Sequence, residues 1–264
     1  MSYDSTPAVS GPSTVADEPM SALYPFLYAA SPTGDPGRPV DRAVDLAVVL
    51  AEATRSTQEK AREIIALREV VRERYGEQIC ACARQLAAAF VAGGRLFAFG
   101  NGGSATDAAA LASRFLYPGR CRPALPAYVL TGDIASVTAL ANDIGFEAAF
   151  ARQLAALARP GDIAVGLSTS GNSPNLLAAL TQARRGGLVT LGLAGDSGGA
   201  MAELDCLDHL FVVPSGSVHR IQEAQTTVYH VLWEMTLAAL PELAGHVPGV
   251  GSDRGATQAG REQP

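Results

Sequence analysis

The chain has 264 residues, of which 48% are apolar and 17% are charged, and its formal net charge at pH 7 is −6. This length suits one large domain with extensions. The acidic balance excludes a broadly basic nucleic-acid-binding protein, although it does not exclude a local basic patch. The first residues lack the basic region and apolar core of a secretory signal, and no apolar run is long enough to span a bilayer. We therefore expect a cytoplasmic protein that binds neither membrane nor nucleic acid directly.

The cysteines show no spacing that is typical of a metal site, and in the cytoplasm we expect reduced thiols. Two of them are two residues apart on an expected helix, so they point in different directions. The four are Cys80, Cys82, Cys121 and Cys206.

Composition divides the chain into a central domain and two tails. Residues 1–39 are rich in Ser, Pro, Gly and Asp, and residues 247–264 are Gly-rich and polar, so both are predicted to be disordered. One short apolar segment in the first tail, Leu23–Tyr28, is a candidate contact for a protein partner or for the domain itself. The domain is expected over residues 40–246.

The domain begins with helical sequence from Val40 to Val91, where Ala, Leu, Arg and Glu dominate. Gly76 is the weak point, and it predicts a boundary between two helices. A long helix that precedes the first strand has little sheet to cover, so we expect it to pack against another subunit.

Beyond Val91, short apolar runs alternate with helical segments, which indicates an α/β fold with a parallel sheet and helices on both faces. The expected strands are Arg95–Phe99, Pro126–Leu130, Ala164–Leu167, Leu188–Leu193 and His209–Pro214. The expected helices are Ala105–Leu116, Ile134–Ala141, Glu147–Leu157, Asn175–Ala183, a short one at Ala200–Ala202, and Arg220–Leu240.

The stretch from Ala164 to Ser173 carries the clearest functional signal. A buried strand turns abruptly into small hydroxyl residues and glycine, and a helix follows. Ligands of open α/β sheets bind at the carboxyl ends of strands, where helix N-termini offer unpaired N–H groups that favour an anion. These hydroxyls could therefore surround a phosphate. The stretch alone is equally compatible with an ordinary N-cap turn, in which Ser and Thr are common.

A second strand–turn–helix unit contains Gly100–Ser104, whose sequence is Gly-Asn-Gly-Gly-Ser. Its glycines, Gly102 and Gly103 among them, allow the backbone to come close to a ligand, and Ser104 can donate to an oxyanion. The turn is neither a dinucleotide fingerprint nor a P-loop, because the required Gly spacing and the Gly-Lys-Ser/Thr sequence are absent.

Five motifs stand in order along the chain: Phe99–Ser104 with Asp107-Ala108, Ala141–Phe146, Leu167–Ser173, Gly195–Gly199 and Arg220–Glu223. Together they resemble the sugar isomerase (SIS) domain and, within it, the phosphoheptose isomerase branch. The resemblance covers about Val70 to Leu240. It implies a three-layer sandwich with a five-stranded parallel sheet of flavodoxin-like winding, preceded by N-terminal helices. It also implies a homotetramer with its sites at subunit interfaces.

The resemblance also implies roles for individual residues. The family's phosphate-binding positions are occupied by Ser104, Ser168, Thr169, Ser170 and Ser173. Its sugar-contacting positions are occupied by Asn101 and Asp143. Gln222 and His230 stand on two of the four positions that bind zinc in some members, and eight residues place them on one helix face. His230 also matches a general acid/base position.

Two family residues are replaced in this chain. Catalytic members carry a His and, four residues later, a Glu that is both metal ligand and base; here these positions hold Ala110 and Arg114. Alanine ligates nothing and arginine stays protonated, so we expect no zinc site and no other cofactor. His219 replaces a common Asp and could supply a proton-transfer group, or it could be a solvated loop residue. Arg114 could contact an anionic group of the substrate.

Two functions fit this pattern. The first is a ketose/aldose phosphosugar isomerase of the kind that acts on sedoheptulose 7-phosphate, with an altered acid/base set that uses His219 and His230. The second is a non-catalytic phosphosugar-sensing or scaffold protein similar to the DnaA initiator-associating proteins, which keep the fold and the tetramer but lack the catalytic Glu. The phosphate loop implies that a sugar phosphate binds in either case, and we favour the isomerase.

Overall fold

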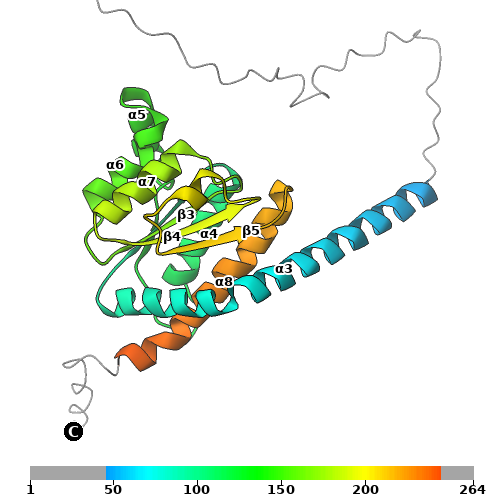
Figure 1. The fold of residues 1–264 in the computed structure, drawn as a ribbon, viewed down its shortest axis with the longest axis horizontal. Coiled ribbons are helices and arrows are strands. Elements are labelled where there is room, and N and C mark those ends of the chain that lie inside the picture. The colour runs from blue at the N-terminus through cyan, green and yellow to red at the C-terminus, as the bar shows by residue number, and fades with distance from the viewer. Residues whose placement is uncertain (1–45, 245–264) are drawn as a thin grey trace, which may run out of the picture. The chain divides into compact units, whose positions relative to one another are not determined.

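The computed structural model describes residues 46–244; the predicted tails at 1–39 and 247–264, with Leu23–Tyr28, lie outside them. Five parallel strands form one sheet in the order β2-β1-β3-β4-β5, which confirms the predicted α/β fold (Figure 1). The strands are β1 (Leu96–Gly100), β2 (Ala127–Val129), β3 (Ile163–Leu167), β4 (Val189–Gly195) and β5 (His209–Val213). The α-helices are α3 (Leu46–Val91), α4 (Gly103–Leu116), α5 (Ile134–Asp143), α6 (Ala149–Leu157), α7 (Pro174–Arg185) and α8 (Val218–Ala244). Two 3₁₀ turns are η1 (Phe146–Ala148) and η2 (Gly199–Glu203).

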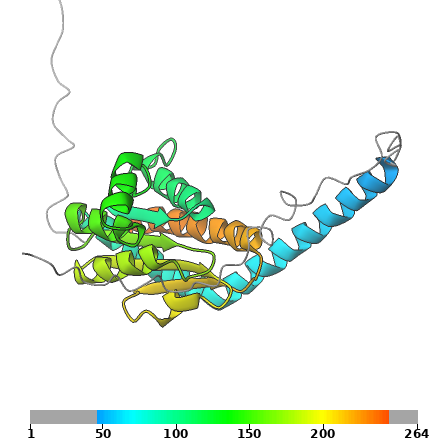
Figure 2. The ribbon, with the colours of Figure 1, turned by 90° about the horizontal axis from the view of Figure 1, so that it is seen from above.

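Two apolar cores lie on opposite faces of the sheet, because successive strand residues point to opposite sides. In β1, Leu96 and Ala98 belong to the core under α3, α4 and α8, whereas Phe97 and Phe99 belong to the core under α6 and α7. Every residue of β1 and β3 is buried. The sheet therefore lies between two helical layers, as the views in Figures 1 and 2 show.

Helix α3 runs without interruption through Gly76, so the predicted boundary at that residue is wrong. A mid-helix glycine costs only about 1 kcal/mol relative to alanine. Tyr75 and Ile79, on either side of it, are buried in the core under the helix. Burying such a side chain stabilises the protein by roughly 1.5–3 kcal/mol, which is enough to outweigh the cost of the glycine.

The observed ends of β2 and α8 differ slightly from the predicted ends. β2 has three residues where five were expected, and α8 starts at Val218 and continues through Pro241 rather than ending at Leu240.

Helix α5 begins directly after Asp133, whose carboxylate accepts hydrogen bonds from the backbone N–H groups of Ala135 and Ser136. No described helix is long and apolar enough to cross a membrane.

At the edge of the sheet where the strands begin, Asp162 links the residues that precede β1 and β3. Its carboxylate accepts hydrogen bonds from the backbone N–H groups of Arg95 (2.8 Å) and Arg159 (2.8 Å), and it forms an ion pair with the Arg95 guanidinium at 2.7 Å. Burial alone would raise the pKa of Asp162, but these hydrogen bonds and the guanidinium charge lower it overall.

We expect Asp162→Asn to lower the free energy of unfolding by about 2–3 kcal/mol at pH 7, because it leaves a partly buried Arg95 without its charge partner. The folded-state pKa of Asp162 is lowered, so its contribution is complete above about pH 5 and is lost as the pH falls through that lowered value. Urea unfolding of both proteins at several pH values measures this. A difference that does not shrink in acid would contradict the assignment.

Candidate functional site

Three loops meet at the carboxyl edge of the sheet. We call them the glycine loop (Gly100–Ser104, after β1), the hydroxyl loop (Ser168–Ser173, after β3) and the glycine turn (Gly195–Gly199, after β4). The register pairs Gly100 with Leu167 and Leu167 with Leu193, so β1 and β3 end level and β4 continues beyond them to Gly195. Between β1 and β3 the winding of the sheet changes direction, and such a switch point forms a ligand-binding crevice in open α/β sheets.

The hydroxyl loop and the glycine turn pack backbone against backbone. Gly171 has φ +70°, and a Cβ there would lie 2.6 Å from the carbonyl carbon of Gly198 and closer still to its oxygen. The Met201 N–H donates to the carbonyl of Gly171 at 2.9 Å, and the Ala200 N–H donates to Oδ1 of Asn172 at 2.8 Å. Only glycine allows this approach, and the approach fixes the path of the hydroxyl loop.

The hydroxyl groups of this loop have two different environments. Ser168 is buried, and its Oγ accepts the Gly171 N–H at 2.9 Å, so it maintains the shape of the loop. Ser170 is exposed, and its Oγ accepts the Asn172 N–H at 3.2 Å, which leaves its own O–H free to donate to a ligand. Ser173 is half-buried at the start of α7.

Two helices, α4 and α7, begin at these loops without side-chain caps. Gly102 is the N-cap of α4 and Ser173 is the N-cap of α7, and neither makes a side-chain cap hydrogen bond. The N-cap of α5, Asp133, does make such bonds. Pro174, the first residue of α7, has no N–H, and the N–H groups of Ser104 and Leu176 already donate to the carbonyls of Asn101 and Ser173, both at 3.0 Å. Among the hydrogen bonds of the described residues, none uses the backbone N–H of Gly103 or Asn175, and together with the helix dipoles these two groups favour an anion. This argues against the ordinary N-cap turn.

Two amide side chains form hydrogen bonds to these loops, although the sequence predicted no role for either. Asn175, in the first turn of α7, exchanges two 2.9 Å hydrogen bonds with Asn101 of the glycine loop. Gln225, fully buried on α8, donates to the carbonyl of Ser168 at 2.7 Å. The partners are 74 and 57 residues apart, so no local pattern pointed to them.

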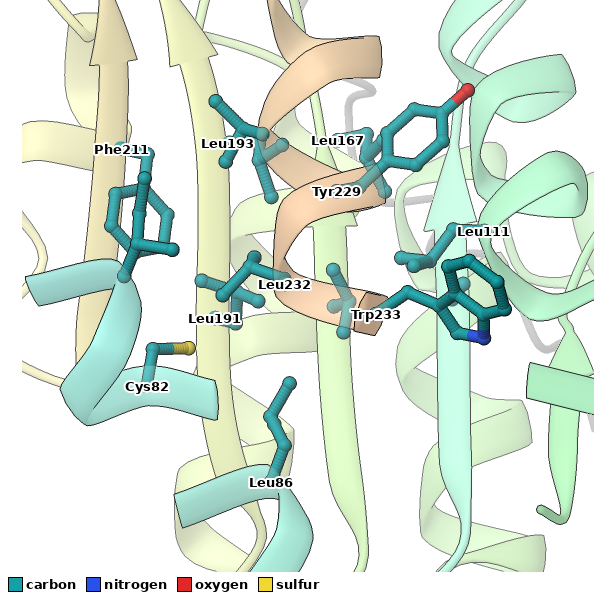
Figure 3. Packing of buried hydrophobic residues seen from close by; sticks show 14 of the residues in the cluster. Cys82, Leu86, Leu111, Leu167, Leu191, Leu193, Phe211, Tyr229, Leu232 and Trp233 are labelled. Carbon is teal, nitrogen blue, oxygen red and sulfur yellow. The ribbon is translucent and has the colours of Figure 1, made fainter. Parts of the chain in front are cut away.

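Below the loops, α4 and α8 face each other. Gln222 donates from Nε2 to Oδ2 of Asp107 at 2.9 Å, and it lies so close to Gly103 that a Cβ there would be 2.5 Å from the amide nitrogen. Burial raises the pKa of Asp107, and the hydrogen bond from Gln222 partly offsets this. About two turns further along α8, the buried Tyr229 side chain directs its hydroxyl toward the carboxyl ends of the strands (Figure 3).

His230 is half-buried on α8, within the electrostatic influence of Arg114 on α4. Burial lowers the pKa of His230 and the Arg114 charge lowers it further, while Glu234 acts in the opposite direction. The imidazole is therefore neutral at pH 7 and can accept a proton. The Arg114 guanidinium lies over the indole of Trp233, with 5.6 Å from Cζ to the ring centroid.

The remaining predicted site residues do not join this group within one chain. His219 is exposed in the first turn of α8, about 16 Å along the helix axis from His230. Asp143 is exposed at the end of α5, where its carboxylate accepts a hydrogen bond from Asn142 at 2.8 Å. Their roles stay predictions.

The residues present do not fit a zinc ion. The Gln222 amide is engaged with Asp107, and two of the ligand positions that the family resemblance implies hold Ala110, which offers no ligand, and Arg114, which is a cation. Over the described part of the chain, no three His, Cys, Asp or Glu side chains are grouped so that they could hold a metal ion.

The order of loops and helices agrees with a known domain. The sequence model of the SIS domain matches residues 61–195, which is half of the chain. The chain belongs to the SIS-domain family. Two curated relatives are the phosphoheptose isomerases of Desulfovibrio desulfuricans and Solidesulfovibrio magneticus. The first is 48% identical over 67% of this chain and 83% of its own length, and the second is 47% identical over 61% and 78%.

Solved structures place this SIS protein in the same branch. The phosphoheptose isomerase of Neisseria gonorrhoeae is 32% identical with a TM-score of 0.64, over 70% of this chain and 98% of that one. The enzyme of Francisella tularensis is 30% identical with a TM-score of 0.63, over 69% and 97%. The predicted family and the predicted branch are confirmed.

Proposed function

We propose that this SIS protein binds a seven-carbon ketose phosphate at the glycine and hydroxyl loops and interconverts its ketose and aldose forms. The observation that carries the proposal is the convergence of two uncapped helix N-termini at the switch point between β1 and β3. Ser104, Thr169, Ser170 and Ser173 belong to the glycine and hydroxyl loops, and their hydroxyl groups are the donors that we assign to the same phosphate. The phosphate of sedoheptulose 7-phosphate supplies the dianion that such a site favours.

The acid/base groups proposed for this reaction are His230 and, in a site completed by another subunit, His219. Neutral His230 lies about 12 Å along α8 from Gln222, which supports a position at the carbonyl end of the substrate. The zinc-binding His and Glu are replaced by Ala110 and Arg114, so the proposed reaction uses no metal.

Titration calorimetry tests the binding part of the proposal. We expect sedoheptulose 7-phosphate to bind at least 100-fold more tightly than sedoheptulose, because charge-assisted hydrogen bonds to the phosphate provide most of the affinity. Equal affinities for the two compounds would contradict the proposed phosphate site.

A non-catalytic phosphosugar sensor or scaffold is the second candidate, and the replacement of the catalytic Glu by Arg114 favours it. Such a protein would bind the same sugar phosphate and a protein partner, without turnover. The two functions differ in whether a proton leaves the carbon next to the carbonyl.

We also propose that the protein is a cytoplasmic homotetramer in which α3 packs against other subunits. Between residues 52 and 70, all α3 side chains except Ser56, Ile64 and Leu67 are exposed in the single chain. Ile65 and Val70 expose 56% and 43% of their surface, so both apolar side chains are accessible to a neighbouring subunit.

We expect the double variant Ile65→Glu/Val70→Glu to form smaller assemblies than the wild-type tetramer, because a buried interface would have to accept two charges. Light scattering coupled to size exclusion measures the mass. Gln58→Glu, which adds a charge to the same helix without removing an apolar side chain, should remain tetrameric. A tetramer that persists in the double variant would contradict this role of α3.

A further inference from the structure

We propose that Arg114 is an oxyanion subsite for the carbonyl end of the bound phosphosugar, so that it selects ligands that carry or develop negative charge there. This inference rests on the proposed function, because it assumes that the phosphate occupies the three loops. It concerns the opposite end of the ligand and the space between α4 and α8.

The first observation is that Arg114 is a positioned cation without an acidic partner. Its Cζ lies 5.6 Å from the centroid of the buried Trp233 ring, and cation–π contacts of this kind hold the guanidinium in place. Arg122 lies over the same ring at 4.8 Å. Among the ion pairs of residues 47–243, none involves Arg114 or Arg122. Arg114 is exposed, so its N–H groups can reach a ligand.

The second observation is that Arg114 shares a helix face with the polar groups of the site. Asp107 and Arg114 are seven residues apart on α4, as are Gln222 and Tyr229 on α8, and seven residues correspond to two turns. The Arg114 charge acts on both Tyr229 and His230. The guanidinium therefore faces the same space as the proposed proton-transfer group.

The third observation concerns length. Ser104 and Arg114 are separated by about 15 Å along the axis of α4, and the arginine side chain leans back toward the helix N-terminus. A seven-carbon chain with a terminal phosphate spans on the order of 10 Å when extended. A phosphate at the three loops therefore brings the carbonyl end of the sugar within reach of Arg114.

Arginine is suited to this task because it stays protonated and donates several N–H groups in a fixed plane. When His230 takes a proton from C1, the C–H electron pair forms the C1=C2 bond and the C2 carbonyl oxygen becomes an enediolate oxyanion. Arg114 donates to that oxyanion. The imidazolium then returns its proton to C2 while the proton on O1 moves to O2, which gives the aldose. The isomerisation written in this way needs neither an oxidant nor a metal ion.

The simplest alternative is a structural role, since a basic residue in the last turn of a helix interacts favourably with the helix dipole. Arg122 provides a matched control. It stacks on the same indole but comes from the loop after α4, so its removal tests the aromatic contact without removing the proposed oxyanion donor.

The test compares two ligands by titration calorimetry: a seven-carbon aldonate 7-phosphate, which carries a carboxylate at C1, and the corresponding alditol 7-phosphate, which does not. We expect the wild-type protein to bind the aldonate at least tenfold more tightly. Arg114→Gln should lose this preference and keep its affinity for the alditol phosphate within about twofold. Arg114→Lys should retain part of the preference, and Arg122→Gln should retain all of it.

An aldonate preference that persists in Arg114→Gln would overturn the subsite. So would a parallel loss in Arg122→Gln, because it would assign the effect to packing on Trp233. Failure of the wild-type protein to bind the alditol phosphate would overturn the proposed phosphate site instead, and with it the placement of the ligand on which the subsite depends.

Discussion

Gly171→Ala is expected to reduce sugar-phosphate affinity by more than 100-fold and to destabilise the fold. A Cβ at this position would overlap the carbonyl group of Gly198, and neither backbone can move without separating the hydroxyl loop from the glycine turn. The φ of +70° adds strain of about 1–3 kcal/mol for any residue with a side chain. The loop would then no longer direct its N–H and hydroxyl groups toward one point.

Calorimetry with sedoheptulose 7-phosphate and thermal unfolding would measure both effects. Gly216→Ala is the control, because a Cβ there meets nothing within 4 Å. A Gly171→Ala protein that binds as tightly as the wild type would show that the packing of these two loops does not shape the site.

The double variant Ser168→Ala/Ser170→Ala is expected to lower sugar-phosphate affinity by 30-fold or more, for two separate reasons. Loss of the Ser168 hydroxyl leaves the buried Gly171 N–H without its acceptor, which loosens the loop. Loss of the Ser170 hydroxyl removes a direct donor to the phosphate, and such charge-assisted hydrogen bonds are stronger than neutral ones.

The single variants separate these two contributions. Ser168→Ala should also lower the thermal stability, because its effect acts through the fold, whereas Ser170→Ala should leave stability unchanged. Ser113→Ala, at an exposed position on α4, is the control. Unchanged affinity in the double variant would remove both residues from the site.

Much of the fold could be predicted from the sequence because its signals are local. The apolar runs of β1 and β3 are followed at once by small residues, and parallel strands that are buried on both faces produce this pattern. Gly76 shows the limit of local reasoning: its low helix propensity predicted a boundary, but the burial of Tyr75 and Ile79 keeps α3 continuous. Propensity is a small term, and tertiary packing overrides it.

The site was predicted less completely than the fold. The Gly and Ser residues of the loops stand out because their composition is unusual, whereas Asn175 and Gln225 resemble ordinary helical residues and matter only through partners far away in the chain. Arg114 was singled out by comparison with a family pattern, but its contact with Trp233 and its effect on the pKa of His230 depend on the packing of α4 against α8.

We propose that this SIS protein moves a proton on a bound ketose phosphate, although Ala110 and Arg114 stand where the family resemblance implies a zinc-binding His and Glu. The most direct test incubates the protein with sedoheptulose 7-phosphate in deuterated buffer and follows the carbons next to the carbonyl by NMR. We expect deuterium at these carbons and the appearance of the aldose, both greatly reduced by His230→Gln. Binding without any exchange would contradict the isomerase and support the sensor or scaffold.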